Sequence, residues 1–366
     1  MQMEGKISYT SAGVNYSAVD PLKKLAQILA KSTSKNSNIN VIEESRGESA
    51  FVWEEADCFR AFVIEGLGTK NLVADQVRKI TGKTYYDQIA QDVVAMIVND
   101  LIVVGAKPQV INAYFATGSS DWFEDEQRAK DLIEGWAKAC NLSGATWGGG
   151  ETPPLRGVIQ EGTIDLAGSA IGIIKPKARL TLGDKLQASD VILLIESSGI
   201  HSNGLTLART LAKDLPEGYS TKLPGGTAFG ETLLKPTFIY VNLVQDLFEA
   251  GVDIHYMVNI TGHGWRKLMR ANRDFTYQIV QIPPIPPIFN FIQEQSRNSD
   301  NDMYATFNMG AGFAIYLPEN HVEKAQLIAQ KHNLKSWKAG VVEEGEKQVI
   351  IKPKNIVFKG EALNLR

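Results

Sequence analysis

A short glycine loop directly after a predicted strand is the first segment whose residue types suggest chemistry. It reads Glu65-Gly66-Leu67-Gly68-Thr69-Lys70 and follows an apolar stretch at residues 58–64. Glycines in such a loop let backbone N–H groups approach phosphate oxygens, and a lysine adds positive charge. Glu65 supplies a carboxylate of the kind that ligates Mg²⁺ beside phosphates. The loop lacks the Walker A pattern, and a tight turn without any ligand is the alternative interpretation.

Three polar residues lie on one face of an otherwise apolar helix, which is predicted at residues 88–104. Asn99 and Asp100 follow Asp92 by seven and eight positions, which places all three on one side, two turns apart. Buried carboxylates are costly unless they are paired or bind a metal. With Glu65, the three residues predict an acidic cluster suited to a hard cation. The alternative is that they cap neighbouring elements or pair with Lys or Arg.

Three further loops that contain glycine are candidate sites for anions. One offers close backbone approach and a carboxylate, and the other two precede predicted helices. Their residues are Gly149, Gly150, Glu151 and Thr152; then His201, Ser202, Asn203 and Gly204; and finally Thr261 and Gly262. His201 could donate a hydrogen bond to phosphate or act as a general acid. Ordinary polar turns are the alternative for all three loops, and no pair of histidines has the spacing of zinc ligands.

The elements that must position these loops mix helices with strands in both halves of the chain. Strands are expected at residues 58–64, 109–116, 164–174, 191–195, 306–317 and 341–351. Helices are expected from Asp20-Pro21, from 204, and at 88–104, 121–140, 231–250 and 321–332. Lys175-Pro176-Lys177 is the expected boundary, which predicts domains at residues 1–175 and 176–366. This mixture predicts a two-domain α/β or α+β fold.

Length and composition favour a soluble protein without nucleic-acid or membrane partners. The 366 residues exceed what one ordinary core needs, and a net charge of −3 gives no basic surplus for a nucleic-acid groove. The two cysteines, Cys58 and Cys140, lack disulfide-type or metal-type spacing, which favours a reducing compartment. The first residues lack the apolar run of a signal peptide, and no apolar stretch is long enough to span a bilayer. We therefore expect a cytoplasmic protein.

In order and spacing, these segments resemble motifs of the AIR synthase (phosphoribosylformylglycinamidine cyclo-ligase) family over nearly the whole chain. The family motif D-G-V-G-T-K corresponds to residues 65–70, D-L-V-A-M-x-V-N-D to 92–100, G-G-E-T to 149–152, and S-G-x-H-S-N-G to 198–204. The most family-specific match, M-Y-x-T-F-N-M-G, falls at residues 303–310. Shorter matches occur at Ala12-Gly13-Val14, at Ala116-Thr117-Gly118 and at residues 234–237.

The resemblance implies an ATP-binding superfamily fold in which an N-terminal α/β domain joins a C-terminal α+β domain. It also implies a homodimer, in which N-terminal strands form a β-barrel between subunits. The implied reaction belongs to purine synthesis and uses ATP to phosphorylate the formyl amide oxygen of formylglycinamidine ribonucleotide. A substrate nitrogen then attacks the activated carbon, phosphate leaves, and the imidazole ring of aminoimidazole ribonucleotide closes.

The resemblance also assigns roles to residues. Lys70, His201 and Asp100 are expected to be catalytic. The Mg²⁺ ligands are expected among Glu65, Asp92, Asn99, Asp100 and Glu151. ATP and its phosphates are expected to contact Gly66, Gly68, Thr69, Lys70, Gly149, Gly150, Thr152, Ser202, Asn203, Gly204, Thr261 and Gly262.

Several loops depart from the family pattern. Glu65 replaces an aspartate, residues 45–49 replace an upstream glycine loop, residues 153–156 replace A-E-M-P, and His263 replaces a glycine. A related enzyme that acts on another amide or acid, or a non-catalytic nucleotide-binding homologue, is therefore the alternative.

Overall fold

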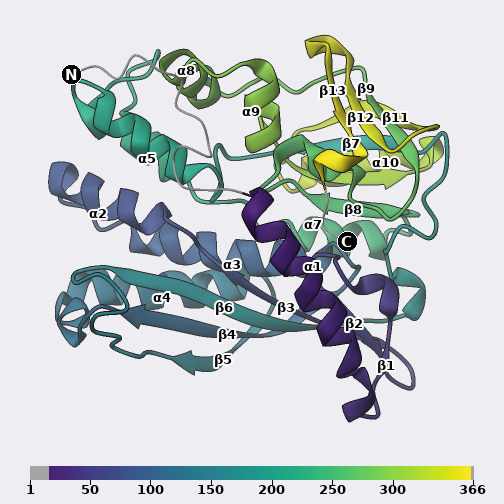
Figure 1. Ribbon diagram of the computed structural model, residues 1–366, viewed down its shortest axis with the longest axis horizontal. Helices are drawn as coiled ribbons and strands as arrows, with labels where there is room; N and C mark the ends of the chain where they lie inside the picture. Colours follow the sequence, from purple (N-terminus) through teal and green to yellow (C-terminus); the bar gives the residue numbers. More distant parts are fainter. Residues whose placement is uncertain (1–15, 364–366) are drawn as a thin grey trace.

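The computed structural model describes residues 16–363, with side chains from residue 21 onward. The Ala12-Gly13-Val14 match lies outside these residues. The chain forms two sheets, with strands before residue 175 in one and strands after residue 190 in the other (Figure 1). Within the described residues, no helix combines the length and apolar character needed to cross a membrane.

The first sheet has six strands in the order β1-β2-β3-β6-β4-β5, and neighbours are antiparallel except for β4 and β5. The strands are β1 (Asn40–Val41), β2 (Phe51–Glu54), β3 (Phe59–Gly66), β4 (Lys107–Thr117), β5 (Thr146–Glu151) and β6 (Ile164–Ile174). The strands expected at residues 58–64, 109–116 and 164–174 are confirmed as β3, β4 and β6.

Among residues 16–363, the helices that pack on this sheet lie on one face. Residues of β6 alternate between buried and more exposed positions, and the buried set faces α3 (Tyr86–Ile102) and α4 (Glu126–Leu142). Gly168 permits the close approach of α3, because a Cβ atom there would lie 2.7 Å from Ile97 Cδ1. The other face leaves Phe62 and Ile64 of β3 43% and 70% exposed. Such exposed apolar side chains on one sheet face are typical of an interaction surface.

The remaining N-terminal helices are α1 (Tyr16–Ser32) and α2 (Lys70–Thr81). The helix expected from Asp20-Pro21 is present, but it begins at Tyr16, so Pro21 lies inside it. α2 begins directly after the Glu65–Lys70 loop and ends at Gly82, whose φ of +76° is the left-handed conformation that glycine adopts readily.

The second sheet has seven strands in the order β13-β12-β9-β11-β7-β10-β8. The strands are β7 (Val191–Glu196), β8 (Tyr256–Asn259), β9 (Phe275–Ile279), β10 (Ala311–Leu317), β11 (Ser336–Glu344), β12 (Gln348–Ile351) and β13 (Ile356–Lys359). All pairings are antiparallel except β12 with β9. Every residue of β10 is buried, which fits its near-continuous apolar sequence.

The helices around this sheet are α5 (Leu205–Asp214), α6 (Phe229–Leu233), α7 (Val241–Glu249), α8 (Pro287–Ser296), α9 (Asp300–Thr306) and α10 (Val322–Lys331). The expected helix at 321–332 and the strand at 191–195 are confirmed as α10 and β7. The expected single helix at 231–250 is wrong. The chain forms α6 and α7, because Pro236 lies between them and cannot continue a helix.

Three other element boundaries differ from the predictions. The strand expected at 306–317 begins only at Ala311, because Met309 and Gly310 adopt φ values of +48° and +101° that form a turn. The single strand expected at 341–351 is two strands, β11 and β12, separated by a turn at Gly345. The helix expected at 121–140 starts as a 3₁₀ turn, and α4 begins after Asp125, whose side chain accepts a hydrogen bond from Arg128 N.

Candidate functional site

The glycine loop at the end of β3 leads directly into α2. Gly66 is the last residue of β3, and Gly68 adopts a φ of +77°, a conformation that would strain a residue with a side chain. Thr69 Oγ1 is buried and has no hydrogen-bond partner among the described residues. Lys70 is the first residue of α2. The loop therefore presents exposed backbone at Gly66 and Gly68, as a phosphate-binding role requires.

Lys70 and Asp92 form an ion pair in the interior. Both side chains are fully buried, and Lys70 Nζ lies 2.8 Å from Asp92 Oδ2. Lys70 Nζ also donates to the carbonyl oxygen of Lys235, at 2.8 Å. Asp92 Oδ1 accepts hydrogen bonds from Thr237 N at 2.8 Å and from Thr237 Oγ1 at 2.5 Å. Burial lowers the pKa of Lys70 and raises that of Asp92, while their attraction opposes both shifts. The pair ties the start of α2 to the connection between α6 and α7.

Asn99 forms hydrogen bonds to the same connection between α6 and α7. Its Oδ1 accepts from Tyr240 N at 2.9 Å, and its Nδ2 donates to Phe238 O at 2.7 Å. Asp92 and Asn99 thus fill the roles of pairing and capping that were the alternative to metal binding.

Glu65 and Asp100 are the two carboxylates that the structure brings together. Burial raises the pKa of Glu65 to about 7, and the charge and hydrogen bonding of Asp100 contribute to this rise. The positive charge of Lys267 acts in the opposite direction and lowers the pKa. Asp100 Oδ1 also accepts from Asn259 Nδ2, at 2.6 Å. Two adjacent carboxylates that repel each other form a site where a divalent cation would be favourable, and Mg²⁺ commonly uses one or two carboxylates plus phosphate oxygens. These oxygen donors fit Mg²⁺.

Basic residues from the second domain face this carboxylate pair. Lys267 is 6% exposed, and its Nζ donates to Thr261 Oγ1. Burial lowers the pKa of Lys267 to about 8, while Asp100 raises it. Arg270 Nε lies 3.4 Å from Glu48 Oε2, and Glu48 Oε1 accepts a hydrogen bond from Tyr256 Oη at 3.0 Å. Sequence reasoning missed Lys267, Arg270 and Glu48. The available signal was the pair of basic residues, Arg266 and Lys267, shortly after Thr261-Gly262.

His201 lies inside its loop. It is 2% exposed and has a left-handed φ of +59°, and its Nε2 accepts a hydrogen bond from Ser198 N at 3.2 Å. Burial lowers its pKa to about 3, with a smaller contribution from the charge of Lys70. The ring is therefore neutral near pH 7, and acceptance at Nε2 leaves the proton on Nδ1. Nδ1 is buried without a partner among the described residues.

The neighbours of His201 join this loop to the other motifs. Ser202 Oγ lies 3.3 Å from Thr237 Oγ1, and Thr237 in turn binds Asp92. Asn203 Nδ2 contacts Met96 Sδ at 3.8 Å. Gly204 caps α5 with a φ of +79°, and a Cβ atom there would lie 2.1 Å from Phe307 Cε1. Gly204 therefore serves close packing as well as the turn.

The segment Met303–Gly310 holds the His201 loop through hydrogen bonds of Asn308. Asn308 Nδ2 donates to Gly199 O at 2.8 Å, and Asn308 Oδ1 accepts from Ser197 Oγ at 2.9 Å. Trp265 Nε1 donates to Asn308 O at 2.8 Å. This hydrogen bond connects the helical turn after Thr261 and Gly262 to the same segment. Phe307 and Met309 are buried and pack in the core.

The Gly149–Thr152 segment is not gathered with the other loops. In the sheet register, Glu151 pairs with Tyr114, Tyr114 with Ala167, and Ala167 with Gly66. Three strand spacings separate Glu151 from β3, or roughly 14 Å. Because side chains alternate along a strand, Glu151 faces the open side of the sheet, whereas Glu65, one residue from Gly66, faces the helices.

The glycines of this segment have a packing explanation. A Cβ atom on Gly150 would lie 2.3 Å from Ala113 O, so Gly150 serves the close pairing of β5 with β4, while Gly149 has a φ of +136°. Thr152 is exposed just after β5. Within residues 16–363, no three His, Cys, Asp or Glu side chains gather as metal ligands. The predicted ligands therefore divide into the Glu65–Asp100 pair, the structural Asp92 and Asn99, and the distant Glu151.

The two-domain fold and its convergent loops define a member of the AIR synthase family. The model described as "AIR synthase related protein, N-terminal domain" matches residues 49–174, and the one described as "AIR synthase related protein, C-terminal domain" matches residues 187–352. The chain belongs to this family.

Curated relatives carry one enzyme name. The phosphoribosylformylglycinamidine cyclo-ligase of Methanocaldococcus jannaschii is 36% identical over 338 residues, which cover 92% of each chain. The enzyme of the same name from Carboxydothermus hydrogenoformans is 34% identical over 354 residues, covering 94% of this chain and 99% of that protein.

Solved structures share the fold. AaThiL complexed with AMPPCP and TMP has a TM-score of 0.60 at 14% identity, covering 94% of this chain and 97% of that one. The HypE–HypF complex has a TM-score of 0.60 at 16% identity, covering 86% and 93%. At these identities the likeness concerns the fold alone.

Proposed function

We propose that this protein is an ATP-dependent cyclo-ligase that converts formylglycinamidine ribonucleotide to aminoimidazole ribonucleotide, ADP and phosphate in purine biosynthesis. The observation that carries the proposal is the 36% identity to a curated phosphoribosylformylglycinamidine cyclo-ligase over 92% of both chains. The contacts that join most of the family's motifs at the junction of the two domains support it, because amide activation requires ATP and the ribonucleotide to be held together.

Glu65 and Asp100 are the residues that would hold Mg²⁺ in this proposal. A bound Mg²⁺ would neutralise charge on the phosphate oxygens during phosphoryl transfer. Lys267, buried beside the pair, balances part of the carboxylate charge. Glu151, three strands away on the open face of the sheet, is not part of the metal group that we propose.

The phosphate contacts in the proposal come from backbone more than from charged side chains. Gly66, Gly68 and Thr69 offer the open backbone of the first loop. Lys70 is occupied by Asp92 and Lys235, so we assign it the role of fixing the start of α2. This positioning role replaces the direct phosphate contact that the sequence suggested.

His201 is the residue we assign to the substrate. Its unpartnered Nδ1–H is a buried donor beside the Ser202–Gly204 turn. Such a donor can orient a substrate oxygen without changing charge, because the ring stays neutral at pH 7. Ser202, Asn203, Gly204, Thr261 and Gly262 remain the proposed anion contacts on the second domain.

Assembly and location extend the proposal. The exposed Phe62 and Ile64 on the open sheet face support a homodimer in which the N-terminal sheets of two copies form a barrel. Domains at residues 1–175 and 176–366 fit the change of sheet between residues 174 and 191. The family's place in purine synthesis, together with two free buried cysteines, supports a cytoplasmic location.

The test is a coupled assay with purified protein, formylglycinamidine ribonucleotide, ATP and Mg²⁺. We expect ADP and aminoimidazole ribonucleotide in equal amounts, and neither product when Mg²⁺ is removed by EDTA. ATP turnover with a different amide or acid, and none with this ribonucleotide, would point to a related enzyme. Tight ATP binding without turnover on any ribonucleotide would contradict catalysis and favour a nucleotide-binding homologue.

A further inference from the structure

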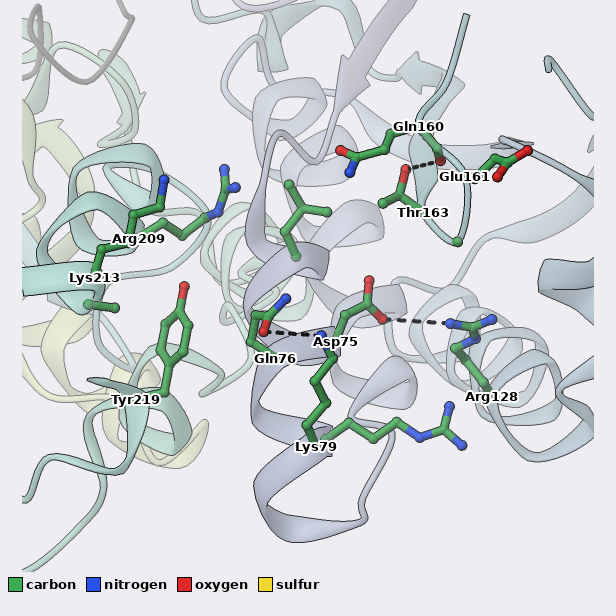
Figure 2. Close-up of a pocket in the computed structure, with 14 residues that line it drawn as sticks. Asp75, Gln76, Lys79, Arg128, Gln160, Glu161, Thr163, Arg209, Lys213 and Tyr219 are labelled. Atoms are coloured by element: carbon green, nitrogen blue, oxygen red, sulfur yellow. Dashed lines mark hydrogen bonds and ion pairs between the residues drawn. The ribbon is translucent and has the colours of Figure 1, made fainter. Parts of the chain in front are cut away.

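A large basic pocket lies beside the proposed active site and is lined by residues of both domains. Its volume is about 710 Å³, within the range of small-molecule sites. One wall is α2, with Gln76 and Lys79, and the opposite wall is α5 and the turn after it, with Arg209, Lys213 and Tyr219 (Figure 2). Residues 160–163, which precede β6, line the pocket from the first domain. An occupant would contact both domains.

The charge of the pocket is strongly positive although the whole chain carries a net charge of −3. Five basic side chains line it, against only two carboxylates, Asp75 and Glu161. Asp75 accepts a hydrogen bond from Tyr86 Oη at 3.0 Å and pairs with one of the five cations, Arg128, at 3.8 Å, while Glu161 pairs with Arg156 at 3.4 Å. The remaining cations therefore dominate the pocket.

Three of these cationic side chains form no ion pair with another described side chain. Among the side chains of residues 21–363, neither Arg209 nor Lys213 nor Lys79 has a carboxylate partner, and Lys79 Nζ donates only to Gln76 Oε1, at 3.3 Å. Arg78, by contrast, is paired with Asp125. Burial raises the pKa of Tyr219, and the adjacent Arg209 guanidinium partly offsets that rise. Arg209 and the Tyr219 hydroxyl therefore sit together as adjacent donors on one wall.

Such a set of donors suits phosphate groups. Guanidinium and ammonium groups, a tyrosine hydroxyl and the side chain of Gln160 can satisfy several phosphate oxygens at once. Like charges held close together without a counter-ion repel each other, and a bound polyanion removes that repulsion. Cationic side chains without a carboxylate partner lie on opposite walls of one cavity. This arrangement suits a ligand that carries more than one anionic group better than it suits a single small ion.

We propose that this pocket binds a phosphorylated small molecule that bridges the two domains. Along α2 the lining extends from Leu72 to Lys79, and Lys79 lies nine residues, or about 14 Å, from Lys70, so the pocket extends well beyond the Glu65–Lys70 loop. Both walls are nevertheless helices that begin at proposed ATP-site loops: α2 at Lys70 and α5 just after Gly204. An occupant thus contacts the two helices whose first turns shape the active site.

The test measures binding of inorganic pyrophosphate by isothermal titration calorimetry, without ATP, ribonucleotide or Mg²⁺, so that its outcome is independent of the proposed reaction. We expect Arg209→Glu/Lys213→Glu to weaken the affinity more than tenfold. The charge-conserving Arg209→Lys/Lys213→Arg variant should stay within about threefold of the wild type. Lys331→Glu, the same charge change on exposed α10, is the matched control and should bind like the wild type.

Two further arms keep the test decisive. If the double reversal does not fold, Lys79→Glu on the opposite wall, at an exposed position, should still weaken pyrophosphate binding. Sulfate should bind at least tenfold more weakly than pyrophosphate. Wild-type affinity in Lys79→Glu or in a folded double reversal would overturn the proposal, and so would equal affinity for sulfate, which would indicate an adventitious anion only.

Discussion

The buried pair of Lys70 and Asp92 gives the most demanding prediction. Both side chains are fully buried at 2.8 Å, and Asp92 also holds Thr237 through two hydrogen bonds. Asp92→Asn keeps the shape but leaves the Lys70 ammonium without its counter-ion. Removing one partner of a buried pair costs about 3–5 kcal/mol, which is a change of roughly 10²- to 10³-fold or more in the folding equilibrium.

The exposed pair Lys130–Glu134 on α4 provides the matched control. Its side chains are 63% and 67% exposed, and its oxygen and nitrogen atoms lie 3.8 Å apart. Solvent screens such a pair, so Glu134→Gln should cost at most about 0.5 kcal/mol. Both variants remove one carboxylate charge from a helix and differ mainly in burial.

The assay is urea unfolding followed by tryptophan fluorescence, with the midpoint compared among variants. Lys70→Met/Asp92→Leu should recover much of the loss, because no charge is left buried without a partner. The midpoint of Asp92→Asn should fall well below that of Glu134→Gln. If the two single variants unfold within about 0.5 kcal/mol of each other, the reasoning that this pair holds α2 to the α6–α7 connection is refuted.

Three more predictions follow from the site and the open sheet face. Asp100→Asn should abolish Mg²⁺-dependent ATP turnover in a steady-state assay while the protein stays folded, and wild-type turnover would exclude Asp100 from the metal site. His201 and His263 both have pKa values lowered to about 3, with burial as the first cause. The unfolded chain therefore binds more protons below pH 6.5, and stability should fall by up to about 1.4 kcal/mol per pH unit for each histidine as the pH drops from 6.5. Urea midpoints at pH 7.5 and 5.5 measure this loss, and His263→Gln should reduce it, whereas an unchanged pH dependence would contradict the assignment. Phe62→Asp/Ile64→Asp should convert a dimer to monomers in sedimentation-velocity runs, and an unchanged dimer would place the interface elsewhere.

Much of the local structure could be read from the sequence because it depends on local patterns. The apolar run that became α3 and the alternating run that became β6 were predicted within two residues of their observed bounds. Errors arose where two short elements were read as one. Residues 231–250 have the pattern of one helix, but Pro236 interrupts it. Residues 341–351 have the pattern of one strand, but Gly345 forms a turn within them.

The partners of the site residues could not be read in this way. Asp92, Asn99 and Asp100 share a helix face, yet Asp92 pairs with Lys70, Asn99 holds backbone atoms 139 and 141 residues away, and Asp100 faces Glu65. Lys267 reaches this pair from the second domain. These contacts depend on how two sheets and their helices pack, which no local periodicity encodes.

The sequence by itself therefore determined the family, many of the helices and strands that carry its motifs, and the residue types available for phosphate and metal chemistry. Only the tertiary structure decided which of them meet. Sheet register placed Glu151 three strands from Glu65 and on the opposite face, and burial committed Lys70 to Asp92. The physical reason is that side-chain direction alternates along a strand and a buried charge must find a partner, so long-range packing, and not residue type, brings Glu65 and Asp100 together.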